Sequence, residues 1–254
     1  MARQARQKSG TGIYHVILRG INKQVIFEDE EDRQKFLAYL QHYKKICNYA
    51  IYGYCLMDNH IHLVLKEQEE DLSSIMKRIG VRYVAWYNRK YARCGHLFQD
   101  RFKSEVIESD EYLLNVLRYI HQNPLKAKLV KKIESFGYSS YAEYVETCRL
   151  IDRDFVLSLF SVEQERACEA FKAFMKGKIN EAECMEAHDT VLLSDEDLKQ
   201  IIQKQFHVKT PADLQAMKKE ERDAYLRIIK RVNGVSTRQI ARLTGISQSV
   251  ISRA

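Results

Sequence analysis

The stretch Met57-Asp58-Asn59-His60-Ile61-His62-Leu63-Val64-Leu65 places two histidines two positions apart within an apolar run. Side chains alternate between the two faces of a β-strand, so His60 and His62 share one face while Ile61 and Leu63 share the other. Two imidazoles side by side on a rigid strand form a chelating pair for a divalent metal ion. Two half-buried, hydrogen-bonded histidines would give the same pattern, so the pair needs support from the rest of the chain.

The hydrophobic periodicity on either side of this stretch predicts alternating strands and helices. A tight turn at Asp58-Asn59 joins the histidine strand to the apolar run before it. The expected elements are a strand at 13–19, a helix near 29–47, strands near 50–57 and 60–66, a helix at 72–90, a hairpin near 96–107 and a helix near 110–122. This β-α-β-β-α-β order predicts an α+β fold with a ferredoxin-like antiparallel sheet.

The helix expected near 110–122 carries a second polar cluster. Its apolar face is marked by Leu113, Leu117 and Ile120 at helical spacing. The opposite side carries Asn115, Tyr119, Gln122 and Asn123, and Pro124 is expected to end the helix. Tyr119 and Asn123 lie one turn apart and point the same way. We expect the sheet face with the two histidines to meet this polar end.

Beyond residue 150 the pattern is almost wholly helical. Short helices are expected near 152–160, 162–175, 179–187, 195–205, 211–216 and 218–232. In the last segment, Ser236 and Ser247 are expected to cap two helices that Gly245 separates by a tight turn. The residues expected to face inward are Ile240, Ala241, Leu243, Val250 and Ile251. The pattern is that of a helix-turn-helix, and its alternative is a three-helix bundle that binds a protein.

Several of these segments match one known family. Asn59-His60-Ile61-His62-Leu63 fits the HUH motif, in which a bulky hydrophobic residue separates two histidines. Residues 119–130 fit the tyrosine-helix pattern of single-tyrosine transposases. Segments 14–20, 98–103 and 138–141 fit the first strand, the basic hairpin and the closing segment of that family. Over about residues 10–145, the chain therefore resembles the REP-associated tyrosine transposases, relatives of the IS200/IS605 transposases.

The resemblance implies a single-strand DNA endonuclease and strand transferase that acts on hairpin DNA. Tyr119 would attack the scissile phosphate and form a 5′-phosphotyrosine with a free 3′-hydroxyl. His60, His62 and Asn123 would hold Mg²⁺ or Mn²⁺. Asn123 departs from the Gln or Glu of some relatives. Relatives differ in whether they act as monomers or homodimers, and the sequence leaves both open.

The charge distribution also indicates a nucleic-acid partner. The net charge is +7, and residues 77–132 carry 13 Lys and Arg against 5 Asp and Glu, whereas residues 151–193 carry 5 against 9. We expect a catalytic domain at 1–150, an acidic helical connector at 151–193 and a helix-turn-helix domain for duplex DNA at 194–254. The residues expected to contact DNA are Arg19, Arg78, Arg82, Arg101, Lys103, Arg238, Gln248, Ser249 and Arg253. A merely solvated basic surface is the alternative.

The remaining composition indicates where the protein acts. None of the six cysteines forms a C-x-x-C pair, which favours reduced thiols over a disulfide scaffold or a structural zinc site. No apolar run reaches the 18 residues of a membrane span, and the polar first residues do not resemble a signal peptide. We therefore expect a cytoplasmic, nucleoid-associated protein without a membrane partner.

Two other functions remain open from the sequence. One is a DNA-binding regulator that keeps the fold but no longer cuts, although the intact His60, His62 and Tyr119 argue against it. The other is a metal-dependent phosphodiesterase that uses water and for which Tyr119 is incidental. A covalent protein–DNA adduct would separate all three functions.

Overall fold

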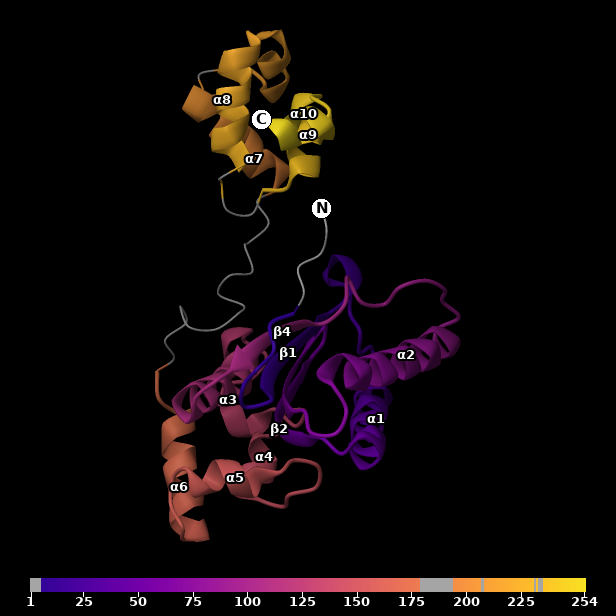
Figure 1. The fold of residues 1–254 in the computed structure, drawn as a ribbon, viewed down its shortest axis with the longest axis vertical. Coiled ribbons are helices and arrows are strands. Elements are labelled where there is room, and N and C mark those ends of the chain that lie inside the picture. The colour runs from indigo at the N-terminus through magenta and orange to yellow at the C-terminus, as the bar shows by residue number, and fades with distance from the viewer. Residues whose placement is uncertain (1–5, 179–193, 207, 231, 233–234) are drawn as a thin grey trace. The chain divides into compact units, whose positions relative to one another are not determined.

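The computed structural model describes residues 6–178, 194–206, 208–230, 232 and 235–254 (Figure 1). The chain divides into two compact units, residues 1–181 and 182–254. Among the residues described, no helix is both long and apolar enough to cross a membrane.

A four-stranded antiparallel sheet forms the centre of the first unit. The strands are β1 (Ile13–Arg19), β2 (Ala50–Met57), β3 (His60–Lys66) and β4 (Lys103–Ile107). They lie in the order β2-β3-β1-β4, with every neighbouring pair antiparallel. With one helix between β1 and β2 and another between β3 and β4, this is the ferredoxin-like arrangement expected from the sequence.

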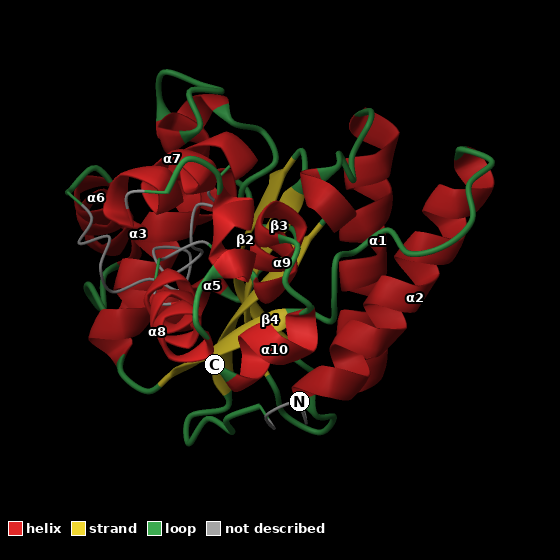
Figure 2. Cartoon of the chain, turned by 90° about the horizontal axis from the view of Figure 1, so that it is seen from above, coloured by secondary structure: helices red, strands yellow, loops and turns green. Residues whose placement is uncertain are grey.

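Helices cover both faces of this sheet (Figures 1 and 2). Helices α1 (Glu30–Cys47) and α2 (Leu72–Lys90) lie on one side, and α3 (Asp110–Lys126) lies on the other. The rings of Phe36 from α1, Tyr83 from α2 and Phe27 pack together with centroids 5.2–5.9 Å apart. The Tyr83 hydroxyl donates to the carbonyl of Ile26 at 2.6 Å, so this buried phenol has its polar group satisfied.

Short helices after α3 complete the first unit. They are α4 (Tyr141–Val145), α5 (Arg153–Ser158) and α6 (Gln164–Met175), together with 3-10 turns at Ile21–Lys23 and Ile133–Ser135. Phe171 of α6 is fully buried and stacks on Tyr144 with centroids 4.3 Å apart. The Gln122 amide of α3 donates to the carbonyls of Met175 and Gly177 at 2.6 and 2.8 Å. The C-terminal end of α6 is therefore hydrogen-bonded to α3.

The second unit is helical and has its own hydrophobic core. Its elements are α7 (Asp195–Phe206), a 3-10 helix (Pro211–Ala216), α8 (Lys219–Lys230), α9 (Thr237–Thr244) and α10 (Gln248–Arg253). The Ser236 side chain caps α9 by accepting from the backbone N–H of Gln239 at 3.1 Å. Gly245 ends α9 in the left-handed region, with φ at 71°, and begins the turn into α10. Ile240 and Ile251 anchor the two helices in the core.

Two local expectations about the first unit are wrong. Pro124 does not end α3, which continues to Lys126. Proline lacks only its own N–H, and the helical bonds resume with Ala127 donating to Asn123 at 2.9 Å. The hairpin near 96–107 is also incomplete, because only β4 joins the sheet. The stretch before it bonds instead to the end of β1 and the residue after it, with Gln99 donating to the carbonyl of Arg19 at 2.9 Å and Phe98 bridging Gly20.

Other expectations about the later segments need revision. Ser247 occupies the N-cap position of α10, but its side chain makes no capping hydrogen bond and pairs with the Ser249 hydroxyl at 3.1 Å. The division at residue 181 differs from the expected limits at 150 and 193, since α5 and α6 pack with the first unit. The helix expected at 179–187 lies outside the described residues.

Candidate functional site

The two histidines of β3 share the sheet face that α3 covers. Their rings have centroids 4.9 Å apart at an interplanar angle of 87°. In the sheet register, His60 lies opposite Arg19 and His62 opposite Ile17. The strand alternation expected from the sequence therefore places both imidazoles on one face of β3, which is one of the two inner strands of the sheet.

Helix α3 brings Tyr119 and Asn123 onto these histidines. The Ser109 hydroxyl caps the helix by accepting from the backbone N–H of Tyr112 at 3.2 Å. The Tyr119 ring meets the His62 ring edge-on, with centroids 5.8 Å apart, and the Asn123 amide nitrogen lies 3.0 Å from His62 Nε2. Tyr119 and Asn123 are only 6% and 8% exposed. The structure thus brings together the four side chains that the sequence pointed to.

Hydrogen bonds orient both imidazoles. His60 Nδ1 lies 2.7 Å from the Asn59 side-chain oxygen, and because that oxygen can only accept, Nδ1 carries the proton. The Asn123 amide nitrogen can only donate, so His62 Nε2 accepts from it. In both rings the Nε2 atom therefore holds the lone pair. This is the form in which a histidine binds a metal ion.

The chemistry of the donor set fits a divalent ion with mixed nitrogen and oxygen ligands. Within the residues that the structure describes, no group of three or more His, Cys, Asp and Glu side chains is arranged to hold a metal ion. The set here consists of two imidazole nitrogens and an amide, whose oxygen becomes available when the Asn123 amide turns over. Imidazole and amide oxygen are both ordinary ligands of first-row divalent metals.

Two polar residues of the site escaped the sequence analysis. His15 of β1 is completely buried, and its Nε2 lies 3.0 Å from His62 Nδ1. On its other side, His15 Nδ1 lies 3.5 Å from Glu105 Oε2 of β4. The alternation of β1 shows that His15 shares a strand face with Arg19. Only the pairing of β1 with β3 and β4 shows that this face is the one with His62.

Several cations lie on the sheet face of the histidines or close to the tyrosine. Arg19 is paired in register with His60, and Lys103 with Ile17, so both lie on the histidine face. The ammonium group of Lys126 lies 4.7 Å from the centre of the Tyr119 ring. Arg101 lies in the exposed loop just before β4. Arg19 and Lys103 therefore share the sheet face of the histidines, and a DNA contact by Arg19, Arg101 or Lys103 stays a prediction.

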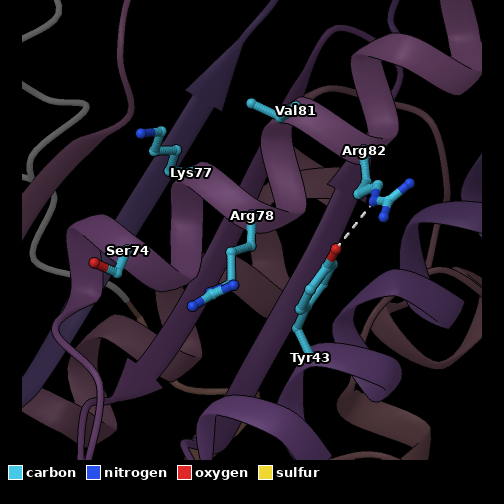
Figure 3. A pocket seen from close by; sticks show the side chains of 6 residues that line it. All are labelled: Tyr43, Ser74, Lys77, Arg78, Val81 and Arg82. Carbon is cyan, nitrogen blue, oxygen red and sulfur yellow. Dashed lines mark hydrogen bonds between the residues drawn. The ribbon is translucent and has the colours of Figure 1, made fainter.

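Arg78 and Arg82, in contrast, belong to a different surface. They line a groove of about 440 Å³ on α2, together with Tyr43 of α1 and with Ser74, Lys77 and Val81 (Figure 3). Arg82 donates to the Tyr43 hydroxyl at 3.3 Å. Arg78 forms a bidentate pair with Glu70 at 2.5 and 3.1 Å, which raises the pKa of the guanidinium. Helices α1 and α2 cover the sheet face opposite Tyr119, so this groove is not part of the tyrosine site.

The remaining expected DNA contacts lie in the second unit. Arg238 is exposed at the start of α9, and Gln248, Ser249 and Arg253 are exposed on α10. Arg253 Nε donates to the carbonyl of Ser249 at 3.2 Å. All four side chains thus belong to the second unit.

Comparison with known proteins agrees with the fold and with the motifs. Residues 9–123 match the model of the family described as Transposase IS200 like. A Haemophilus influenzae protein, whose name places it among the REP-associated tyrosine transposases, is 26% identical over 147 residues, covering 53% of this chain and 81% of that protein. A solved structure of a REP-associated tyrosine transposase bound to a REP hairpin shares the fold, with a TM-score of 0.50 and 18% identity over 61% of this chain and 90% of that one.

The matched segment ends at residue 123 and so contains both polar clusters of the site. Its central part is the sheet with His60 and His62, and its last turn holds Tyr119 and Asn123. Over residues 9–123, the chain is therefore similar to the IS200-like transposases.

Proposed function

We propose that the first unit cleaves and rejoins single-stranded DNA at a hairpin, with Tyr119 as the nucleophile. The observation that carries this proposal is the edge-on contact between Tyr119 and His62, with Asn123 hydrogen-bonded to the same ring. A tyrosine that served only for packing would have no need of buried polar neighbours on a sheet face. The family resemblance and the hairpin-bound relative support DNA as the substrate.

In this proposal the reaction exchanges one phosphate ester for another. The Tyr119 oxygen attacks the scissile phosphorus, a new oxygen–phosphorus bond forms, and the bond from phosphorus to the 3′-oxygen breaks. The phenolic proton leaves to solvent, and the departing 3′-oxygen takes up a proton to become a hydroxyl. The phosphotyrosine conserves the bond energy, so rejoining by the reverse steps needs no ATP.

We further propose that His60 Nε2, His62 Nε2 and the Asn123 amide oxygen hold Mg²⁺ or Mn²⁺. When bound, such an ion polarises the phosphate and offsets the negative charge of the transition state. The chain's own contribution is to present both lone pairs on one rigid strand and to place the phenol beside them. Arg19 and Lys103 would bind the flanking phosphates.

The test of the nucleophile is Tyr119→Phe, which removes one hydroxyl and keeps the ring. With hairpin oligonucleotides in Mg²⁺ or Mn²⁺, cleavage and the covalent adduct should vanish while DNA binding persists. Tyr112→Phe is the matched control, since it removes the same group two turns earlier on α3. Cleavage without an adduct would support a water-using phosphodiesterase, and binding without cleavage by the unaltered protein would support a regulator.

The test of the metal site is calorimetric titration with Mn²⁺. One site is expected, which His60→Ala or His62→Ala abolishes and Asn123→Ala only weakens, because a neutral amide is a weaker ligand than imidazole. Unchanged affinity in both histidine variants would refute the assignment.

For the second unit we propose binding to duplex DNA through a helix-turn-helix formed by α9 and α10. Its support is the turn at Gly245 and the exposed polar side chains of α10. A protein with these two activities would act in the cytoplasm, at the nucleoid.

A further inference from the structure

A line of polar side chains crosses the sheet behind the candidate metal ligand His62, from Glu105 of β4 through His15 of β1 to His62 of β3. His15 has no exposed surface, although it lies in the middle of a strand whose other buried residues are apolar or aromatic. Its two ring nitrogens face two polar groups, His62 Nδ1 at 3.0 Å and Glu105 Oε2 at 3.5 Å. A buried imidazole costs free energy unless its nitrogens are paired, so its presence requires a reason.

The hydrogen atoms along this line have one consistent order. The Asn123 amide nitrogen donates to His62 Nε2, so the His62 proton is on Nδ1 and is donated to His15 Nε2. His15 must then carry its own proton on Nδ1, which faces the Glu105 carboxylate. The reverse order would direct a bare His15 lone pair at a carboxylate. The Glu105 carboxylate at one end of the line therefore favours the same direction that the Asn123 amide sets at the other end.

We propose that Glu105 and His15 are positioning residues, which hold His62 with Nδ1 protonated and with Nε2 turned toward the metal and Tyr119. The inference rests on the proposed metal site but concerns residues that this site does not include. A hydrogen-bond acceptor behind a metal-binding histidine fixes its tautomer and ring orientation and raises its basicity. Here the support comes from two further strands, β1 and β4, so three neighbouring strands contribute to the orientation of one ligand.

The first test is Mn²⁺ affinity of the full chain by calorimetry. His15→Phe keeps a ring of similar size but cannot accept from His62 Nδ1, so affinity should fall by roughly 10- to 100-fold, the range found for such outer partners. His15→Gln offers an amide oxygen as acceptor and should recover most of the affinity. Leu18→Val is the matched control, because Leu18 is buried on the opposite face of the same strand, where it pairs with Ile61, and it should bind as the unaltered protein does.

The second test does not need metal or activity. In metal-free protein labelled with ¹⁵N-histidine, the nitrogen shifts of His62, assigned by their loss in His62→Ala, should show protonated Nδ1 and bare Nε2. Glu105→Leu should shift this tautomer balance, whereas Glu105→Gln, which retains an oxygen acceptor, should not. If His15→Phe does not fold, the Glu105 pair still decides the question.

The inference is overturned if His62 carries its proton on Nε2, or if folded His15→Phe binds Mn²⁺ as tightly as the unaltered protein. Absence of Mn²⁺ binding in the unaltered protein would instead refute the proposed metal site. In that case the tautomer measurement still decides whether Glu105 and His15 orient His62.

Discussion

The ammonium group of Lys126 lies 4.7 Å from the centre of the ring of Tyr119, the proposed nucleophile. A cation in this position stabilises the negative charge that develops on the phenol oxygen and the phosphate. We expect Lys126→Met to slow cleavage by roughly tenfold, which corresponds to about 1.4 kcal/mol of transition-state stabilisation. Lys126→Arg should retain most of the rate. The measurement is single-turnover cleavage of a hairpin oligonucleotide.

The control for this prediction is Lys128→Met, which removes the same charge just beyond the end of α3. It should weaken DNA binding slightly and leave the cleavage step unchanged. Equal loss of rate in both lysine variants would show that only the general positive charge matters, and not the position of Lys126.

His121, two residues after Tyr119, gives the protein a specific sensitivity to acid. Burial among Tyr141, Tyr144 and Phe171 lowers its pKa to about 3 from the usual 6.5. Between these values the unfolded chain binds a proton that the folded protein does not, so stability falls as pH drops below 6.5 and levels off below about 3. From pH 6.5 to 5, the contribution should be about 2 kcal/mol.

Urea unfolding at pH 7.5 and pH 5 measures this effect. His121→Leu should lose less stability than the unaltered protein over that interval, because the titrating group is gone. The Ser140 hydroxyl lies 2.8 Å from His121 Nε2 in the unaltered protein. It keeps a partner in the variant, because it also accepts from the backbone N–H of Tyr54 at 2.9 Å. Identical pH dependence of the two proteins would contradict the assignment.

Single residues were predictable from the sequence where a local period fixes their direction. The strand alternation paired His60 with His62, and the helical turn paired Tyr119 with Asn123, each within a few residues. His15 and Glu105 were not predictable in this way. Their place beside His62 depends on which strands are neighbours and in what register, and that pairing is set by contacts far apart in the sequence.

At the scale of elements, the close approach of α3 to β2 depends on a missing side chain at Gly53. A Cβ atom there would lie 2.6 Å from Leu117 Cδ2 and 3.1 Å from Ile120 Cδ1, both in the buried face of α3. We expect Gly53→Ala to destabilise the protein by about 1–3 kcal/mol, the usual cost of overpacking. Because α3 carries Tyr119, cleavage should fall as well. Urea unfolding and cleavage rates measure the two effects.

Gly80 provides the matched comparison for this substitution. It lies within α2, and a Cβ atom there would have no neighbour within 4 Å. Gly80→Ala should therefore stabilise the protein by about 0.5–1 kcal/mol through helix propensity and leave cleavage unchanged. If both alanines destabilised the protein to a similar extent, the close packing of α3 on β2 at Gly53 would not be the cause of the destabilisation.

The elements themselves were predictable where hydrophobic periods are long and uninterrupted, as in β1, α1, β2, β3 and α2. The errors arose where a local rule competes with tertiary contacts. Pro124 was expected to end α3, but its missing N–H costs a single bond, and the helical bonds resume with Ala127 donating to the Asn123 carbonyl. The expected hairpin was lost because its first half bonds to the end of β1 and the residue after it.

At the scale of the whole molecule, the boundary between the units was the hardest feature to predict. The composition of 151–193 predicted an acidic helical connector. However, Phe171 and Met175 lie one turn apart on α6 and are fully buried, and the Arg118 guanidinium of α3 lies 4.3 Å from the centre of the Phe174 ring. Net charge describes the exposed side of such a helix and does not reveal that the apolar side packs against α3.

The second unit is the part of the chain for which binding to duplex DNA is proposed. Its core encloses Leu198, Leu226 and Ile240, so residues 194–254 have the apolar contacts to fold as a fragment. We expect this fragment to bind duplex DNA with a strong dependence on salt, since phosphate contacts release counterions. Arg238→Ala and Arg253→Ala should each reduce the slope of log affinity against log salt by about 1. Fluorescence anisotropy from 50 to 200 mM salt would measure it.

The discriminating control is Lys199→Ala, which removes one exposed charge from α7, outside α9 and α10. A helix-turn-helix predicts that this variant keeps the salt slope of the unaltered fragment, because only α9 and α10 approach the phosphates. Equal effects of all three substitutions would indicate nonspecific attraction to a basic surface. No binding to any duplex at low salt would favour a protein-binding bundle. In every case Tyr119→Phe in the full chain should leave duplex affinity unchanged, because the duplex contacts are proposed for the second unit and the tyrosine belongs to the first.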